Sequence, residues 1–224
     1  IRYCLWLVEC PPEELRKSKE LSHRIKEVKK LREASSKQAT QKDAMRSWEF
    51  QEIRQPGVDY LAIPSHSSET RDYVPIARFP AEVICNNALL IVADASLVTF
   101  AFLSSSAFNA WNKAVSGRIK NDTRISASIT YNNFPFPNLN AKSQSALENA
   151  ALGVLEARKQ FPNSSLADLY GASSMPISLM KAHKSLDEKV NSILGLTKDV
   201  SEEELLSKLF SDYESLSRGQ TLVD

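Results

Sequence analysis

The side chains that most often do chemistry are few in this chain and stand far apart. Its three histidines are His23, His66 and His183, and none has a second metal ligand at a usable spacing. His183 falls near the apolar face of an expected helix, where a packed core residue is the commoner outcome. His66 lies in a serine-rich loop, but no GxSxG-like turn supports a nucleophile there. The histidines therefore predict neither a metal site nor a catalytic triad.

Acidic residues, lysines and glycines do not build a catalytic site either. Glu27-Val28-Lys29 and Asp187-Glu188-Lys189 resemble pieces of nuclease motifs, but chance explains them better because both fall on expected helices among many charges. The six glycines are dispersed, so no GxGxxG motif and no P-loop can form. Asn133-Phe134-Pro135-Phe136 lacks the paired prolines of the Asn-Pro-Pro-aromatic loop of adenine amino-methyltransferases. We therefore expect this chain to be non-catalytic and to hold no cofactor or metal.

The cysteines and the hydropathy pattern bear on the compartment. Cys4, Cys10 and Cys85 are too few and too scattered for a disulfide framework, which favours a reducing environment. No window approaches the roughly 18 apolar residues that span a bilayer. The chain begins at Ile1 without a Met or a charged-then-apolar leader. We expect a cytoplasmic piece of a longer protein, with no membrane segment.

Apolar periodicity predicts an α+β fold in which a mixed sheet region lies between a long N-terminal helix and a C-terminal helical group. The long helix is expected from about residue 12 to the mid-forties, after a buried strand or entry segment over residues 1–9. Capping signals place a buried helix over 96–116, opened by Ser96, and a last helix opened by Ser201 and Glu204. Strands are expected at 60–63, 73–76, 83–85, 88–92 and 125–131, a polar loop at 118–124, and further helices near 146–155, 165–170 and 179–193.

Charge is distributed unevenly along the chain. Lys and Arg number 28 against 27 Asp and Glu, a net charge of +1, and that total alone would argue against a nucleic-acid partner. Residues 1–140 carry +4, however, and residues 141–224 carry −3. Residues 15–46 alone carry +7. A negatively charged partner would therefore meet the N-terminal half, although a lone basic run is more often a solvated helix face.

Several stretches resemble one known family. YCLWLVECPPEEL, RQPGVDYLAIPSHSSETRDYVPI, FLSSSAFNAWNKAVSGRIKNDTRIS and YNNFPFP are similar to the C-terminal part of MmeI-type enzymes. ARKQFPNSSLADLYGASSMPISLMKAHKSLDEKV resembles the helical tail of the same family. These enzymes are single-chain type IIG restriction-modification proteins and related adenine-specific DNA methyltransferases. The resemblance runs in order over about residues 1 to 195.

The resemblance implies a division of labour along the parent protein. A methyltransferase domain that binds S-adenosylmethionine, and in some members a nuclease, precedes a target-recognition domain. The chain would then be the recognition part, with residues 1–47 as a connecting strand and basic helix, 48–140 as the target-recognition domain and 141–224 as a helical segment. Its expected partners are double-stranded DNA and the upstream methyltransferase domain, with S-adenosylmethionine bound only by the parent enzyme.

The same resemblance assigns base reading to the polar 118–124 loop. Lys120 can donate to the two acceptors of guanine in the major groove, and Asp122 can accept from the cytosine amino group, so together they would fix one G·C pair. Arg124 would read a neighbouring guanine or hold a phosphate. Asn87 and Ala88, in the 86–88 turn, are a second pair of candidates. Further candidates with a weaker case are Ser65, His66 and Ser68.

Four basic residues are expected to position the DNA by contacting phosphates: Arg71, Arg78, Lys113 and Arg118. Each of them could instead form a surface salt bridge. Two other functions stay open at this point. The chain could be a helical scaffold that docks protein domains without touching DNA, or a specificity module like the type I restriction subunits that acts in trans.

Overall fold

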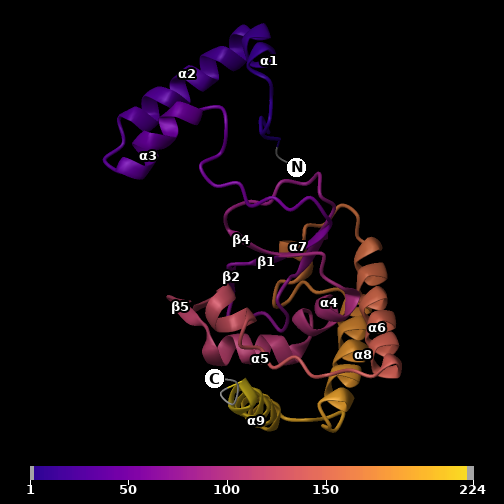
Figure 1. Cartoon of the computed structure of the whole chain (residues 1–224). Helices are drawn as coiled ribbons and strands as arrows, with labels where there is room; N and C mark the ends of the chain where they lie inside the picture. Colours follow the sequence, from indigo (N-terminus) through magenta and orange to yellow (C-terminus); the bar gives the residue numbers. More distant parts are fainter. Residues whose placement is uncertain (1–2, 221–224) are drawn as a thin grey trace. The chain divides into compact units, whose positions relative to one another are not determined.

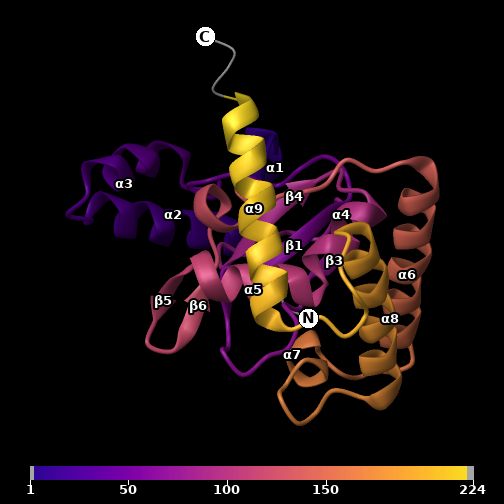
Figure 2. The same cartoon turned by 90° about the horizontal axis from the view of Figure 1, so that it is seen from below.

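The computed structural model describes residues 3–220. The chain divides into two compact units, Ile1–Arg54 and Gln55–Asp224, and Figures 1 and 2 show it from two directions. The α+β prediction is confirmed, since small antiparallel sheets precede a C-terminal group of helices. No helix within residues 3–220 combines the length and the apolar composition that crossing a bilayer requires.

The first unit is built from short helices. They are α1 (Pro12–Lys17), α2 (Lys19–Glu33), α3 (Gln38–Lys42) and the 3-10 helix η1 (Asp43–Arg46). The prediction of one long helix is wrong because Ser18 has an extended backbone and its hydroxyl accepts the N–H of Leu21, which caps a new helix. The chain then reverses after α2, and the Arg32 guanidinium donates to three backbone carbonyls within residues 43–49.

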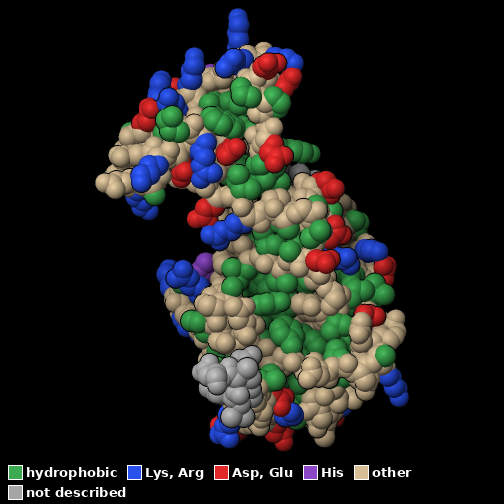
Figure 3. Space-filling view, viewed as in Figure 1, with side chains coloured by type: hydrophobic (Ala, Val, Ile, Leu, Met, Phe, Trp, Pro, Cys, Tyr) green, Lys and Arg blue, Asp and Glu red, His purple; other side chains and the backbone are tan. Residues whose placement is uncertain are grey.

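The apolar segment before α1 is not a strand in its described part, residues 3–9. Tyr3 is 93% exposed and Leu5 53%, so the predicted burial is wrong there; residues 1–2 lie outside the described residues. Trp6 does pack on Phe50, with ring centroids 5.7 Å apart. Figure 3 shows Lys and Arg side chains standing out over α1 and α2. This solvated basic surface fits the ordinary behaviour of a charged helix face.

The second unit contains two small sheets. The first has the order β3-β1-β4 and the second the order β2-β6-β5, and all pairings given are antiparallel. The strands predicted at 60–63 and 88–92 are confirmed. The predicted 118–124 loop is instead a hairpin. The strand bounds are β1 (Tyr60–Pro64), β2 (His66–Ser67), β3 (Ala77–Phe79), β4 (Leu89–Ala93), β5 (Gly117–Ile119) and β6 (Asp122–Arg124).

The strand predicted at 83–85 is wrong because side chains bind its backbone. The Gln55 amide donates to the Val83 carbonyl at 2.9 Å, and its oxygen accepts the N–H of Cys85 at 2.9 Å. Tyr60 also donates to the Val83 carbonyl, at 2.6 Å. Backbone groups satisfied in this way need no neighbouring strand.

The strand predicted at 73–76 is wrong as well, since β3 begins only at Ala77. Tyr73, Val74 and Ile76 are all buried, which a half-buried strand with alternating faces would not allow. The Asn109 amide donates to the carbonyls of the two residues before this segment. The chain is therefore held in an irregular path that points three side chains into the core.

Two further segments differ in kind from the prediction. The helix expected over 96–116 is two helices, α4 (Leu97–Leu103) and α5 (Ser106–Val115), because Ser105 caps the second as Ser96 caps the first. The strand expected over 125–131 is a short π-helix, η2 (Ala127–Tyr131). Ser126 caps it, and its carbonyl accepts the N–H of Tyr131, five residues on.

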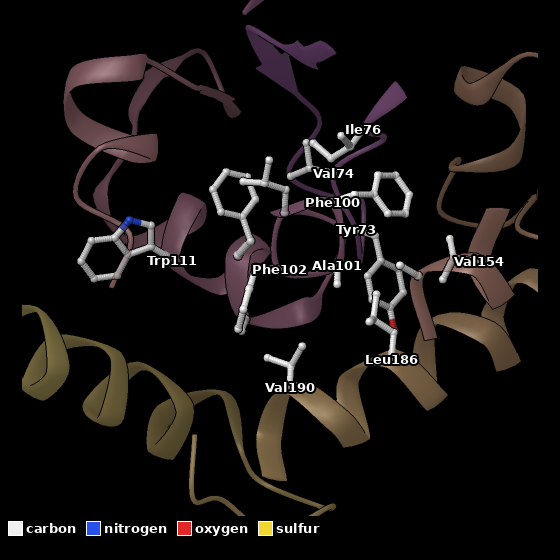
Figure 4. Close-up of a cluster of buried hydrophobic side chains, with 14 of the residues drawn as sticks. Tyr73, Val74, Ile76, Phe100, Ala101, Phe102, Trp111, Val154, Leu186 and Val190 are labelled. Carbon is white, nitrogen blue, oxygen red and sulfur yellow. The ribbon is translucent and has the colours of Figure 1, made fainter. Parts of the chain in front are cut away.

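The core of the second unit surrounds α4. Four consecutive α4 residues, 100–103, are fully buried, so the helix is covered on every side. Figure 4 shows Phe100 and Phe102 between Val74 on one side and Val190 on the other. Helices α6 (Ala141–Lys159) and α8 (Ile177–Ile193) both contact α4, and Val190 belongs to α8.

The C-terminal helices follow the predicted order. After α6 come α7 (Leu166–Leu169), α8 and α9 (Glu202–Gln220). Ser201 and Glu204 bond reciprocally at the start of α9, as the capping-box pattern predicts. Gly195 ends α8 with a φ of 76°, a conformation that residues with a Cβ rarely adopt. Figures 1 and 2 both place the β5–β6 hairpin on the side of the unit away from α6 and α8.

Candidate nucleic-acid interface

The β5–β6 hairpin carries the two most specific candidates at its tip. Ile119 pairs with Asp122, so the turn consists of Lys120 and Asn121. Lys120 has a φ of 54°, which is unfavourable for a residue with a long side chain. Lys120 and Asp122 are exposed, and within residues 3–220 neither side chain has a hydrogen-bond or ion-pair partner. The local ion pair that would give them an ordinary surface role is therefore not formed.

The strand register sorts the small sheet into two faces. His66 pairs with Arg124 and Ser67 with Thr123, and residues two apart on a strand share a face. Ser67 and Thr123 are each 1% exposed and form the inner face. The outer face carries His66, Asp122 and Arg124, all exposed. Figure 3 shows basic side chains gathered over the edge where β5 lies.

A buried polar network fixes the inner face to the core. Thr123 Oγ1 donates to the Ser67 carbonyl at 3.1 Å and accepts from Asn112 Nδ2 at 3.0 Å. The Asn112 oxygen in turn accepts from Ser116 Oγ at 2.7 Å, and Ser116 bonds to Thr130 Oγ1 at 2.6 Å. The network therefore ties the hairpin to α5 and η2 while its outer face stays free.

Thr123→Val is expected to lower the free energy of unfolding by about 1–3 kcal/mol. The valine keeps the shape but leaves the Asn112 amide without its acceptor in a buried site, and it removes the side-chain bond to the Ser67 carbonyl. The neighbouring Asp122→Asn, on the exposed face, is the matched control and should stay within about 0.5 kcal/mol of the parent sequence. Urea unfolding measures both, and equal values for the two variants would contradict the inner anchor.

Arg118 braces the hairpin from its edge. Its guanidinium donates to the carbonyls of Lys113 and Asn121, each at 3.0 Å. The first bond reaches back to α5 and the second crosses to the turn. Other guanidinium N–H groups stay available, so a phosphate contact of Arg118 remains a prediction beside this structural role.

A second group of candidates lies where the two small sheets meet. Ser65 donates from its N–H and from its hydroxyl to the Ala88 carbonyl, at 2.9 and 2.8 Å. The Ser65 carbonyl accepts from the N–H of Ile125, directly after Arg124. Backbone segments separated by about 20 to 60 residues in the sequence therefore come together at this junction.

The two asparagines of the 86–88 turn have different roles. Asn86 Oδ1 accepts the N–H of Ala88 at 2.8 Å, which is the usual backbone reason for an Asn in a turn. Asn87 is exposed, and its side chain has no partner in the described part of the chain. Of the two, Asn87 is the one available to a ligand.

The remaining basic candidates are dispersed. Arg78 pairs with Leu61 near the start of β1, whereas the junction follows the end of that strand. It also faces Asp59 at 3.8 Å, which is the surface ion pair expected of an ordinary exposed arginine. Lys113 lines a cavity of about 420 Å³ whose wall also holds Asp72 and Asp187. Arg71 is half-buried, with no side-chain partner among the residues described.

A second polar group, in part buried, joins the C-terminal helices to the sheet region. Asp187 accepts from the Tyr73 hydroxyl and from the N–H of Ser106, both at 2.8 Å. Burial raises the pKa of the Asp187 carboxyl, while these two hydrogen bonds lower it. Its acid–lysine neighbourhood is therefore structural, and sequence spacing gave no sign of this role.

His183 belongs to the same polar group. It is fully buried, as its place on the apolar face predicts, and Nδ1 donates to the Ser104 carbonyl at 3.0 Å. Nε2 lies 2.6 Å from the Tyr170 hydroxyl, which also accepts from Arg158 Nε at 2.8 Å. Burial first, and the Arg158 charge second, lower the pKa of His183 to about 3.

The low pKa of His183 predicts a loss of stability in acid. Between about pH 6.5 and 3 the unfolded chain binds a proton at His183 that the folded chain does not. The free energy of unfolding therefore decreases as the pH is lowered through this range, by up to about 1.4 kcal/mol per pH unit. The raised pKa of Asp187 acts in the opposite sense, since its contribution is present at low pH and is lost as pH rises through the folded pKa. The His183→Gln variant isolates the histidine, because other groups titrate in both proteins. Its unfolding free energy should depend less steeply on pH between 6 and 4, by about one proton; an unchanged slope would contradict the assignment.

Comparisons with known proteins agree on one family. Residues 1–138 match the family described as "MmeI, target recognition domain", and residues 139–221 match "MmeI, C-terminal domain". DNA methyltransferase A of Bacillus subtilis (strain 168) is 35% identical over 217 residues, 97% of this chain and 25% of that protein. A solved structure of the type IIL restriction-modification enzyme MmeI in complex with DNA is 39% identical, with a TM-score of 0.92 over 96% of this chain and 29% of that one. The chain thus spans a quarter to three tenths of these relatives.

Proposed function

Since the chain belongs to the family of the MmeI target recognition domain, continued by the MmeI C-terminal domain, we propose that it binds double-stranded DNA and reads a specific sequence. It would do so for an adenine methyltransferase domain of the same polypeptide, which binds S-adenosylmethionine, with or without a nuclease. The similar enzyme MmeI was solved with DNA, and the similar Bacillus protein is named a DNA methyltransferase. Because the DNA of a bacterium lies in the cytoplasm, we place a parent enzyme like the Bacillus protein in that compartment.

One observation carries the proposal. A rigidly anchored hairpin presents Lys120 and Asp122, of opposite charge, without a partner within the described residues. A donor and an acceptor two residues apart suit the major-groove edge of one G·C pair, where guanine offers two acceptors and cytosine an amino group. Strain at Lys120 is consistent with selection for function, since glycine would relieve it.

The remaining residues receive supporting roles in this proposal. Asn87 and Arg124 would contact neighbouring bases from the junction and the outer face. Ala88 would offer its methyl group to a thymine methyl. Residues 1–47 connect to the methyltransferase domain, residues 48–140 recognise the target, and residues 141–224 brace the recognition domain.

Lys120→Gly in the parent enzyme separates reading from folding. Glycine adopts the positive φ of this turn without strain, so the folded chain should be as stable as before or more stable by up to about 1 kcal/mol. Loss of the donor should nevertheless relax discrimination at one base pair by about 5- to 150-fold. Mapping all methylated sites in DNA from a host without its own methylation measures this. Lys181→Ala, which removes the same charge from an exposed position on α8, is the control.

An unchanged site map in Lys120→Gly and in Asp122→Ala would overturn the assignment of reading to the hairpin. If parent enzyme in which residues 60–124 are replaced by a relative's keeps its original site map, the recognition proposal itself fails. The chain would then be a helical scaffold for other domains.

Phosphate contacts predict a different signature. Arg71→Ala and Lys113→Ala should weaken binding on all DNA sequences alike, and each should reduce the slope of log K against log[salt] by about 0.9. Equilibrium binding of the parent enzyme to target and to unrelated DNA, over a series of salt concentrations, measures the slope. Lys181→Ala again serves as the charge-matched control. A slope unchanged by Arg71→Ala or Lys113→Ala would remove that residue from the phosphate contacts.

A further inference from the structure

The hydrogen bonds at Ser65 determine which nitrogen of His66 carries the proton. Ser65 Oγ lies 2.8 Å from the Ala88 carbonyl and 3.0 Å from His66 Nδ1. A hydroxyl has one hydrogen to donate, and a carbonyl can only accept, so that hydrogen goes to Ala88. Ser65 Oγ must then accept from the ring, and His66 Nδ1 carries a hydrogen.

The tautomer gives the other end of the ring a defined chemistry. With Nδ1 protonated, Nε2 of the neutral imidazole is a hydrogen-bond acceptor. His66 is exposed, and within residues 3–220 Nε2 has no partner. The side chain stands on the outer face beside Arg124, its pairing partner, and on the same face as Asp122. Cross-strand neighbours of this kind have Cβ atoms about 5 Å apart, close enough to meet one or adjacent base pairs.

Ser65 itself is poorly placed to read a base. It is half-buried, its hydroxyl hydrogen is held by Ala88, and one of its lone pairs is occupied by the His66 ring. Only its second lone pair is left to meet a base.

We propose that His66 reads the exocyclic amino group of an adenine or a cytosine in the major groove through Nε2, and that Ser65 is a positioning residue that fixes the required tautomer. This inference rests on the proposed function. The two bases are the only ones that present an amino donor in that groove. Arg124 beside it is a donor, so the outer face would combine a fixed acceptor and a fixed donor.

Three variants of the parent enzyme test the reading role. His66→Asn can still donate to Ser65 Oγ from a position close to Nδ1 but offers nothing at the position of Nε2. Its methylated sites should show discrimination relaxed about 5- to 150-fold at a single base pair whose reading strand carries adenine or cytosine. His66→Gln, whose side-chain oxygen can reach the Nε2 position, should restore part of it. Ser65→Ala should relax the same base pair less, because the Ser65 N–H still holds the Ala88 carbonyl.

A spectroscopic measurement tests the tautomer directly. In mildly alkaline buffer, where histidine rings are generally neutral, long-range ¹H–¹⁵N correlation spectra of this chain should show Nδ1 of His66 protonated. In Ser65→Ala the ring should shift toward the Nε2-protonated form. A protonated Nε2 in the unchanged chain would overturn the positioning role of Ser65.

The outcomes separate this inference from the proposed function. If Lys120→Gly relaxes one base pair while His66→Asn leaves the site map unchanged, the inference fails and the proposed function stands. If His66→Asn weakens binding on every sequence and lowers the salt slope, His66 is a phosphate contact and the inference also fails. If the exchange of residues 60–124 leaves the map unchanged, the proposed function fails first.

Discussion

Interchanging the two hairpin residues, Lys120→Asp together with Asp122→Lys, is expected to reverse the orientation of the recognised base pair. The original base pair loses the hydrogen bonds that guanine accepts from Lys120 and that the cytosine amino group donates to Asp122. Each is worth about 1–3 kcal/mol, so methylation at the original site should fall by about 30- to 10⁴-fold. When guanine and cytosine exchange strands, guanine faces the new lysine at position 122 and cytosine faces the new aspartate at position 120. The net charge of the chain is unchanged, so the attraction to phosphates stays the same.

The fold should tolerate the interchange. Both positions are exposed, and the positive φ at Lys120 suits Asp better than Lys, because short polar side chains adopt that conformation more readily. Single variants should lose the original site without gaining the reversed one, so only the double variant moves the specificity. Genome-wide maps of methylated sites from the four proteins measure this. Equal activity of the double variant on both orientations would mean that the two residues do not act on one base pair.

Local signals in the sequence predicted local structure well. Ser96 and Ser201 mark helix starts where the structure places them, because each of these signals depends only on neighbours within a few residues. The buried strand at 60–63 and the apolar face that holds His183 were equally predictable from hydropathy. The charge asymmetry pointed to the N-terminal half of the chain, but its positive excess lies in residues 15–46, outside the unit that carries the hairpin.

Distant side chains decided what the sequence could not. Gln55 satisfies the backbone near residue 84, about 30 residues away, and so replaces a strand pairing that the apolar pattern suggested. The Asn109 amide does the same for the chain before Tyr73. Asn112 and Thr123 hold the hairpin through a buried bond that no spacing rule anticipates. Such bonds appear only once the fold brings the partners together.

The candidate site was predictable in part from the sequence, and in part it depends on contacts between distant residues. Family resemblance placed Lys120 and Asp122 correctly on a surface segment, but it described a loop where the register shows a hairpin with distinct faces. The faces explain why Thr123, between two exposed residues, must be structural. They also strengthen the case for His66, because it stands exposed on the outer face opposite Arg124.

Arg158→Ala is expected to cost the second unit about 3–5 kcal/mol of stability. Arg158 Nη1 donates to the buried Ile76 carbonyl at 2.7 Å, Nε donates to the Tyr170 hydroxyl, and the guanidinium lies 5.2 Å from the Phe100 ring centroid. Alanine leaves the Ile76 carbonyl without this donor, and the Tyr170 hydroxyl keeps only its bond to His183. It also removes the cation from the rings of Phe100 and Tyr170. The bonds that would be lost join α6 to the sheet region and to α7.

Urea unfolding followed by Trp111 fluorescence, with Trp6 and Trp48 replaced by Phe, measures the second unit alone. The matched control is Lys159→Ala, the next residue, whose ion pair with Glu156 is exposed on both sides and should matter by less than about 0.5 kcal/mol. Arg158→Lys should fall between the two, since an ammonium cannot reach the Ile76 carbonyl and both aromatic rings with one geometry. A loss below about 1 kcal/mol for Arg158→Ala would show that the brace is not what holds the C-terminal helices in place. At a temperature where it is folded, the parent enzyme that carries Arg158→Ala should still methylate the original sites. Arg158 does not contact the hairpin and affects it only through the stability of the fold.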